Sequence, residues 1–268
     1  MEAYCQGLRL DTRSAVARYH LGRLLARAHH DAEALHEFRE AVELDPANTS
    51  YHYALARSLK AAGRDAESRA EFEKVPKLTE RERTIERAGA ENAKGIALAK
   101  LGKLEAAAVK FELAIQINPA LADAHYNLGG VRLKTGDLAG AQSEFRQAVD
   151  LNPDFIEARD QLASLLVKAN RWQASAQQLQ AVLTLRPGRL ESRYRLVEAL
   201  QQLGDHQGVV RELSQCLLLD PENPLSHYNL GVALLLSGNQ AQAKQEFRRA
   251  LALKPDYEDA RRAIAAVR

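Results

Sequence analysis

The sequence has few cysteines and no long apolar run. Its 268 residues include 2 cysteines, 1 methionine and 1 tryptophan. The two cysteines, Cys5 and Cys216, cannot make a disulfide framework, which fits a reducing compartment. The longest uninterrupted aliphatic stretch runs from Val232 to Leu236, far short of the roughly 20 apolar residues that a membrane helix needs. No positively charged start precedes an apolar run, so we expect no signal peptide, no membrane insertion and, by default, a cytoplasmic protein.

An excess of one charge is also missing. The chain has 37 lysines and arginines against 35 aspartates and glutamates, and this net charge of +2 is too small to indicate nucleic acid as a partner. It contains neither the P-loop pattern nor GxGxxG. His20, His29, His30 and His36 lie close together in the sequence, but no pattern of ligand spacing accompanies them, so we expect no metal site. No nucleophile–base pair can be recognised, and we therefore expect no enzyme and no cofactor.

Proline is scarce but regularly spaced. Five of the 8 prolines follow one another at intervals of 34 residues: Pro119, Pro153, Pro187, Pro221 and Pro255. A fixed period of this size indicates a solenoid of stacked repeats rather than separate globular domains. Pro46 lies two periods plus five residues before Pro119. With this proline at position 32 of the unit, the repeats span residues 15–48, 49–82, 88–121, 122–155, 156–189, 190–223 and 224–257, with a short insertion at 83–87.

Each unit contains the pattern of two helices. A leucine or similar residue recurs at unit position 7, glycine or alanine at position 8, and a glycine near position 15 ends the first helix. The second helix has small residues at positions 20 and 27 and a large one at position 24, as in Ala141, Phe145 and Ala148. Small residues let paired helices approach closely, and proline ends the second helix. Cys216 replaces a small packing residue, so we expect a buried, unreactive thiol.

This pattern resembles the tetratricopeptide repeat family over nearly the whole chain, and units 1, 3, 4 and 7 match it best. The resemblance implies an all-α fold, a right-handed superhelical solenoid of helix-turn-helix repeats. We expect seven full repeats over residues 15–257, an N-terminal half-repeat helix at residues 1–14 and a C-terminal capping helix at residues 258–268. Because the chain starts on half a repeat, we also expect it to be a piece of a longer protein.

The junction between units 2 and 3 departs from the pattern. Unit 2 has Glu80 where the closing proline should stand, and extra residues follow before unit 3. Thr79 and Glu82 form the Thr-x-x-Glu pattern of a capping box, so we expect the first helix of unit 3 to begin near Glu80 and to run to about Leu101. Its additional charged turns are either a solvated helix end or an edge that contacts a partner.

The resemblance also implies a binding surface. In the family, the first helices line a concave groove that holds an extended peptide or a partner helix, mainly through unit positions 2, 5, 6, 9, 12 and 13. An asparagine at position 6 resembles the family's backbone-clamping asparagines, because an amide both donates and accepts hydrogen bonds. Asn127 and Asn229 match that motif, and Gln161 approximates it. The resemblance places these residues in the groove: Arg23, Arg57, Tyr126, Asn127, Lys134, Gln161, Lys168, Tyr194, Arg195, Tyr228 and Asn229.

Charges are distributed unevenly over the groove positions. Position 13 is basic in Arg27, Lys100, Lys134 and Lys168, whereas position 2 is acidic in Asp123, Glu157 and Glu191. Facing rows of opposite charge would steer an extended charged ligand. At position 9, Arg23 and Arg57 only loosely resemble the family's clamp for a C-terminal carboxylate. The alternative for each charge is solvation of an exposed face, and the alternative for the tyrosines is packing.

Unit 7 differs from the others because apolar residues occupy its groove positions. Val232, Leu235 and Leu236 stand where polar residues are found elsewhere. An exposed apolar patch in a groove indicates a partner that covers it. The alternative is that the closing helix covers most of the patch through Ile264 and Val267.

The sequence therefore predicts a non-catalytic protein-interaction scaffold that binds an extended peptide or partner segment in its concave groove. Two other functions stay open. One is a self-associating module that forms homo-oligomers, and the other is a repeat segment that recruits substrates for a larger multidomain enzyme. The core of the groove site is expected to be Asn127, Asn229, Arg195, Lys134 and Lys168.

Overall fold

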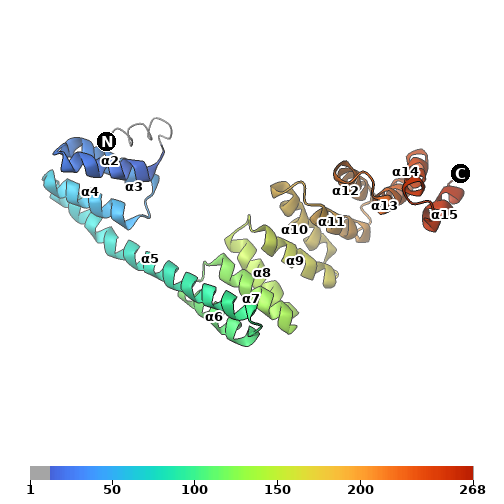
Figure 1. Cartoon of the computed structure of the whole chain (residues 1–268), viewed down its shortest axis with the longest axis horizontal. Coiled ribbons are helices and arrows are strands. Elements are labelled where there is room, and N and C mark those ends of the chain that lie inside the picture. The colour runs from blue at the N-terminus through green and yellow to red at the C-terminus, as the bar shows by residue number, and fades with distance from the viewer. Residues whose placement is uncertain (1–12, 268) are drawn as a thin grey trace. The chain divides into compact units, whose positions relative to one another are not determined.

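The computed structural model describes residues 13–267, and all regular secondary structure in that range is α-helical (Figure 1). This confirms the predicted all-α fold. The half-repeat helix predicted at residues 1–14 falls almost wholly outside the described residues. The chain divides into two compact units, Met1–Gly89 and Ala90–Arg268. Within the described range, no helix combines the length and the apolar character needed to cross a membrane.

The first unit consists of two helix-turn-helix pairs. They are formed by α2 (Ala15–Arg27), α3 (Asp31–Leu44), α4 (Thr49–Ala61) and the beginning of α5 (Asp65–Lys100). The first helix of each pair starts at a side-chain cap. Ser14 accepts a hydrogen bond from the backbone N–H of Ala17 at 3.3 Å, and Asn48 accepts one from that of Ser50 at 3.1 Å.

The second unit continues with helix-turn-helix pairs from the end of α5 onward (Figure 1). Its further helices are α6 (Leu104–Ile117), α7 (Ala122–Thr135), α8 (Leu138–Leu151), α9 (Ile156–Lys168), α10 (Trp172–Leu185), α11 (Leu190–Gln202), α12 (His206–Leu219), α13 (Pro224–Leu236), α14 (Gln240–Leu253) and α15 (Glu258–Ala266). Gly136, with a φ of +87°, is the left-handed residue that ends α7. α8 ends at Leu151, directly before Asn152 and Pro153, because proline disfavours a helical residue before it.

Helix α5 corrects one prediction. We expected a new helix to begin near Glu80, but α5 runs without interruption from Asp65 to Lys100. No proline stands at the end of unit 2 to stop the helix, and Pro76 lies inside it. Thr79 does not cap a helix start, because its hydroxyl donates to the carbonyl oxygen of Val75 at 2.9 Å in the preceding turn. The second helix of repeat 2 and the first helix of repeat 3 are therefore one helix.

The cores of the repeats lie between the paired helices and follow one steric rule. Phe145, at unit position 24, is 1% exposed, and its ring lies 2.8 Å from where a Cβ atom on Gly129 would stand. Position 8 must therefore be glycine when position 24 is a buried phenylalanine. Where position 24 holds the smaller Leu179, position 8 holds Ala163. Burial of these side chains is the main apolar stabilisation within each repeat.

A polar bridge links unit positions 4 and 23 in all seven units, and in the fifth it is a hydrogen bond of 2.6 Å from Arg159 to the neutral Gln178. The residue at position 4 is histidine in three units, which pair as His52 with Glu71 at 2.6 Å, His125 with Glu144 at 2.7 Å and His227 with Glu246 at 2.7 Å. The other ring nitrogen of each histidine lies 2.9 to 3.2 Å from the carbonyl oxygen of the preceding proline. This bridge joins both helices of a repeat to the turn that precedes them.

The bridge predicts a loss of stability in acid. Burial alone would raise the pKa of the Glu71 carboxyl, but hydrogen bonds from Lys74 and His52 outweigh it and hold that pKa below its ordinary value. Such a carboxyl adds stability above its unfolded-state pKa, and this contribution is lost as the pH falls through the folded-state pKa. We expect Glu71→Gln to lower stability at pH 7 by about 1–3 kcal/mol and to flatten the decline below about pH 5. Thermal melting between neutral and acid pH measures both effects.

The matched control for this experiment is Glu73→Gln, which removes the same charge at an exposed position of α5. It should lower stability by less than about 0.5 kcal/mol. Parallel pH profiles for the wild type and Glu71→Gln would contradict the assignment.

Candidate interaction groove

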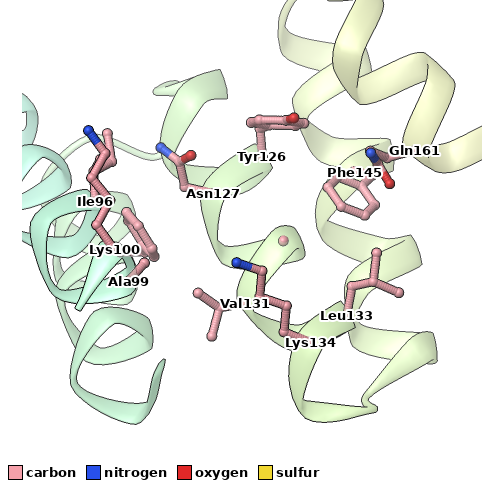
Figure 2. Close-up of a pocket in the computed structure, with 12 residues that line it drawn as sticks. Ile96, Ala99, Lys100, Tyr126, Asn127, Val131, Leu133, Lys134, Phe145 and Gln161 are labelled. Atoms are coloured by element: carbon pink, nitrogen blue, oxygen red, sulfur yellow. The ribbon is translucent and has the colours of Figure 1, made fainter. Parts of the chain in front are cut away.

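The second unit contains a hollow of about 370 Å³ between the end of α5, α7 and α9 (Figure 2). Four of the predicted groove residues line it together: Tyr126, Asn127, Lys134 and Gln161. The rest of the lining comes from Ile96, Ala99, Lys100, Phe111, Gly130, Val131, Leu133 and Phe145. Most of these residues stand at unit positions 5, 6, 9, 12 and 13, which are five of the six positions that the family resemblance places in the groove. The hollow is mainly apolar, with amide and ammonium groups at its edge, a composition suited to a peptide.

Asn127 is the central polar group of this hollow. Its Nδ2 donates a hydrogen bond to Oδ1 of Asn92 at 3.0 Å, so the neighbouring first helix fixes the orientation of the amide. Among the described residues no donor reaches Oδ1 of Asn127. The side chain is half-buried, so this oxygen is available to a backbone N–H of a ligand. Figure 2 shows Gln161 across the hollow from Asn127.

Two ammonium groups border the hollow. Lys100 and Lys134 are exposed, and neither forms an ion pair with any described carboxylate. In contrast, Lys94 and Lys110 of the same unit both pair with Glu91, at 2.5 and 2.9 Å. Lys100 and Lys134 thus place unpaired positive charge beside the hollow, where it favours an acceptor-rich ligand.

Gly130 leaves the floor of the hollow open. A Cβ atom built on Gly130 would meet nothing within 4 Å, whereas one on the adjacent Gly129 would overlap the ring of Phe145. Packing therefore explains the glycine at position 129 and does not explain the one at 130. Sequence reasoning missed Gly130, although it stands at groove position 9, where Arg23 and Arg57 had been noticed in units 1 and 2.

The tyrosines at unit position 5 contact other side chains of the repeats. Tyr126 lies with its ring centroid 4.9 Å from that of Phe155 and 5.7 Å from that of Phe145. Burial, followed by the charges of Glu157 and Asp160, raises the pKa of the Tyr126 hydroxyl, which stays protonated and able to donate. The hydroxyl of Tyr194 forms a hydrogen bond of 2.9 Å with that of Ser226.

Tyr228 belongs to the same class. Its ring lies 5.0 Å from that of Tyr257 and 5.7 Å from that of Phe247. The packing alternative considered for these tyrosines thus describes much of what they do, and ligand contact by their exposed edges stays a prediction.

A second hollow, of about 320 Å³, lies between α11 and α13. Asn229 and Tyr194 line it, together with Val197, Glu198, Gln201, Leu213, Asn223, Leu225 and Ser226. Arg195 is paired with Glu191 at 2.6 Å, one turn earlier on α11, and it lines neither hollow. Lys168, at the end of α9, also lines neither. The predicted core of the site is therefore divided between two hollows, and two of its members stand outside both.

The apolar patch predicted in unit 7 is partly covered. Val232 and Leu235 are half-buried against the core cluster that also includes Ile264 and Val267. Leu236 remains 59% exposed at the end of α13. The patch is therefore partly buried in this cluster, and one of its leucines lies in solvent.

Arg23 and Arg57 lie in the first unit, where they line a separate cleft. Among the described residues, no group of three or more histidine, cysteine, aspartate or glutamate side chains is arranged to hold a metal ion. Cys216 is buried, as predicted, and burial raises the pKa of its thiol to about 11, which disfavours the reactive thiolate.

Comparison with known proteins agrees with the repeat pattern. A family profile described as TPR repeat matches residues 95–136. A profile described as tetratricopeptide repeat matches residues 122–155 and 224–257. A second profile with that description matches residues 19–81 and 161–208. No curated protein matches the sequence at a significant level.

Similar solved structures are also repeat proteins. One is YrrB, described as a TPR protein with an unusual peptide-binding site. It is 18% identical over 84% of this chain and 96% of its own, with a TM-score of 0.54. A structure of the MamA protein is 18% identical over 65% of this chain and 95% of its own, with a TM-score of 0.55. Another MamA structure, AMB-1, is 23% identical over 65% and 96%, also with a TM-score of 0.55. At these identities the likeness shows the fold.

Proposed function

Because this chain belongs to the tetratricopeptide repeat family, we propose that it is a non-catalytic protein-interaction scaffold. Its second unit binds an extended peptide or partner segment along the first helices of its repeats. The observation that carries the proposal is the hollow around Gly130, where a fixed asparagine amide and two unpaired ammonium groups surround an open apolar floor. The peptide-binding site named for YrrB, whose fold is similar, supports the same class of function.

The chemistry of the hollow fits a peptide backbone. Asn127 offers an acceptor to a backbone N–H, and Gln161 offers both a donor and an acceptor from the next first helix. Such contacts read the backbone regardless of side chain, while the apolar floor of Ile96 and Val131 accommodates one apolar side chain. A ligand would thus lie across several repeats.

Closing the hollow should abolish this function. Gly130→Trp fills the space that no described atom occupies, and we expect at least a tenfold loss of affinity, which corresponds to about 1.4 kcal/mol. The measurement is affinity selection from a random peptide library against the whole chain, followed by titration of the selected peptides. Helicity and melting temperature should be retained, because a Cβ atom at this position meets nothing within 4 Å and the indole extends into the hollow.

The matched control is Gly130→Ala, which adds a methyl group at the same position and leaves the hollow open. It should bind the selected peptides as the wild type does. Equal affinity for all three proteins would refute the groove as the binding site.

A further inference from the structure

The first unit has a cleft of its own, with a different chemistry. It measures about 580 Å³ and lies along α2 and α4. Arg23 and Arg27 line it from α2 and Arg57 from α4, together with the rings of Tyr19 and Tyr53. In this cleft Ala54 of repeat 2 stands at position 6, the position that Asn127 of repeat 4 holds in the other hollow. The cleft thus lacks the amide that reads a backbone and holds three guanidinium groups instead.

These three arginines form no ion pairs with the described residues. All three are exposed. Other arginines of the unit are paired, such as Arg39 and Arg64, which both reach Glu67. The only acidic side chain in the lining is Asp31. The cleft therefore carries an excess of positive charge that the fold does not neutralise.

Two tyrosine rings lie in the cleft, and one of them contacts an arginine. The guanidinium of Arg23 lies over the ring of Tyr19, 5.5 Å from its centroid. Tyr53 is 48% exposed, and its ring meets that of Phe72 edge-on with centroids 5.7 Å apart. Planar guanidinium groups bind carboxylates through two parallel hydrogen bonds, and stacking on a ring reduces the freedom lost when they do so. The surface is suited to carboxylates more than to any neutral ligand.

We infer that this cleft binds an acidic peptide segment, whose aspartate or glutamate side chains pair with Arg23, Arg27 and Arg57. The inference rests on the proposed function of the chain as an interaction scaffold and names the class of partner for its first unit. Arg23 and Arg27 lie one turn apart on α2, and Arg57 stands at the same unit position on α4 as Arg23 does on α2. Acidic side chains from successive parts of one extended segment can therefore be held at the same time.

The test is a fluorescence anisotropy titration of the whole chain with a short labelled peptide of alternating glutamate and valine, amidated at its C-terminus. The same peptide with glutamine in place of glutamate should bind at least about tenfold more weakly. Affinity for the acidic peptide should fall as salt is added, because the arginines are exposed. Arg23→Gln and Arg57→Gln should each weaken it by about tenfold, since each removes a charged hydrogen-bond donor.

Arg39→Gln is the matched control, because it removes an equal charge from the same unit at a position that pairs with Glu67 and does not line the cleft. It should leave the affinity unchanged. Equal binding of the glutamate and glutamine peptides would overturn the inference, as would wild-type affinity in Arg23→Gln and Arg57→Gln. So would binding that requires a free C-terminal carboxylate, because the ligand group would then be the chain end.

Gly130→Trp separates this inference from the proposed function. The substitution lies in the second unit, so binding of the acidic peptide should persist in it. If the acidic peptide fails to bind while library peptides still bind in a manner that Gly130→Trp abolishes, the inference falls and the proposed function stands. If the acidic peptide binds as expected and Gly130→Trp leaves the binding of library peptides unchanged, the groove of the second unit is refuted and the cleft of the first unit remains.

Discussion

Gly129→Ala is expected to destabilise the protein by about 1–3 kcal/mol, whereas Gly130→Ala is expected to be neutral or to stabilise it by up to about 1 kcal/mol. The two residues are neighbours on α7 with ordinary helical backbones. A methyl group on Gly129 would lie 2.8 Å from the ring of Phe145, which is 1% exposed and cannot move without disturbing the core. A methyl group on Gly130 meets nothing within 4 Å. Urea denaturation followed by circular dichroism measures the difference.

The chain contains a natural rescue for Gly129→Ala. In repeat 5 the equivalent positions hold Ala163 and Leu179, both fully buried. The double variant Gly129→Ala with Phe145→Leu reproduces that pair, so its loss of stability should be smaller than the sum of the two single losses. Additive losses would show that the overlap is relieved elsewhere, and the steric rule would then be wrong.

Repeat 2 shows the outcome of breaking the rule. It combines Ala56 at position 8 with Phe72 at position 24, and Phe72 is 37% exposed. The equivalent phenylalanines opposite glycine are at most 4% exposed. A phenylalanine opposite alanine is thus partly in solvent. We therefore expect Gly129→Ala to destabilise the protein because Phe145 loses apolar burial.

Much of the fold was predictable because the same residue types mark the ends of the helices in most repeats. Proline ends the second helices, glycine such as Gly136 ends first helices, and small residues mark close helix contacts. The groove positions came from the resemblance to the family, in which unit positions 5, 6, 9, 12 and 13 of the first helices contact the ligand. Four of the predicted residues indeed line one hollow. Arg195 could not be placed from the sequence, because its pairing with Glu191 depends on side-chain choices along α11.

The continuous helix α5 was mispredicted because local sequence signals favour a break and a new helix start within it. Thr79 and Glu82 have the spacing of a capping box, and Pro76 favours a break. One other residue of this helix departs from the repeat pattern. Unit position 7, a leucine in the other repeats, is Lys94 in repeat 3, where it is exposed and paired with Glu91. Lys94 therefore does not make the buried apolar contact that leucine makes at this position in the other repeats.

His125→Ala is expected to destabilise the protein by about 2–4 kcal/mol, whereas His125→Arg is expected to stay within about 1 kcal/mol of the wild type. The His125 side chain is 10% exposed, and its ring nitrogens lie 2.7 Å from Glu144 and 3.2 Å from the carbonyl oxygen of Pro119. Removing the ring leaves both acceptors without this donor. Arg132 still reaches Glu144 at 3.1 Å, which limits the loss. Urea denaturation of the three proteins measures these differences.

Arginine is the right replacement because other repeats already use it. Arg193, at the equivalent position, donates to Glu212 and, at 2.7 Å, to the carbonyl oxygen of Pro187. Arg159 and Arg261 likewise donate to the carbonyl oxygens of the prolines that precede them, at 2.7 and 2.8 Å. Two bonds from one side chain to a carboxylate and a carbonyl require a group that only donates, and guanidinium and doubly protonated imidazole both meet this requirement.

Repeat 3 shows why the cation stands at position 4 and the anion at position 23. There the polarity is reversed, with Glu91 at position 4 and Lys110 at position 23, 2.9 Å apart. No proline turn precedes this repeat, since α5 is continuous, and so no carbonyl oxygen needs a donor from position 4. The reversed pair His125→Glu with Glu144→Lys should therefore fail in repeat 4, because the new carboxylate would face the carbonyl oxygen of Pro119. A reversed pair as stable as His125→Arg would show that the bridge acts only between the two helices and that the proline turn plays no part.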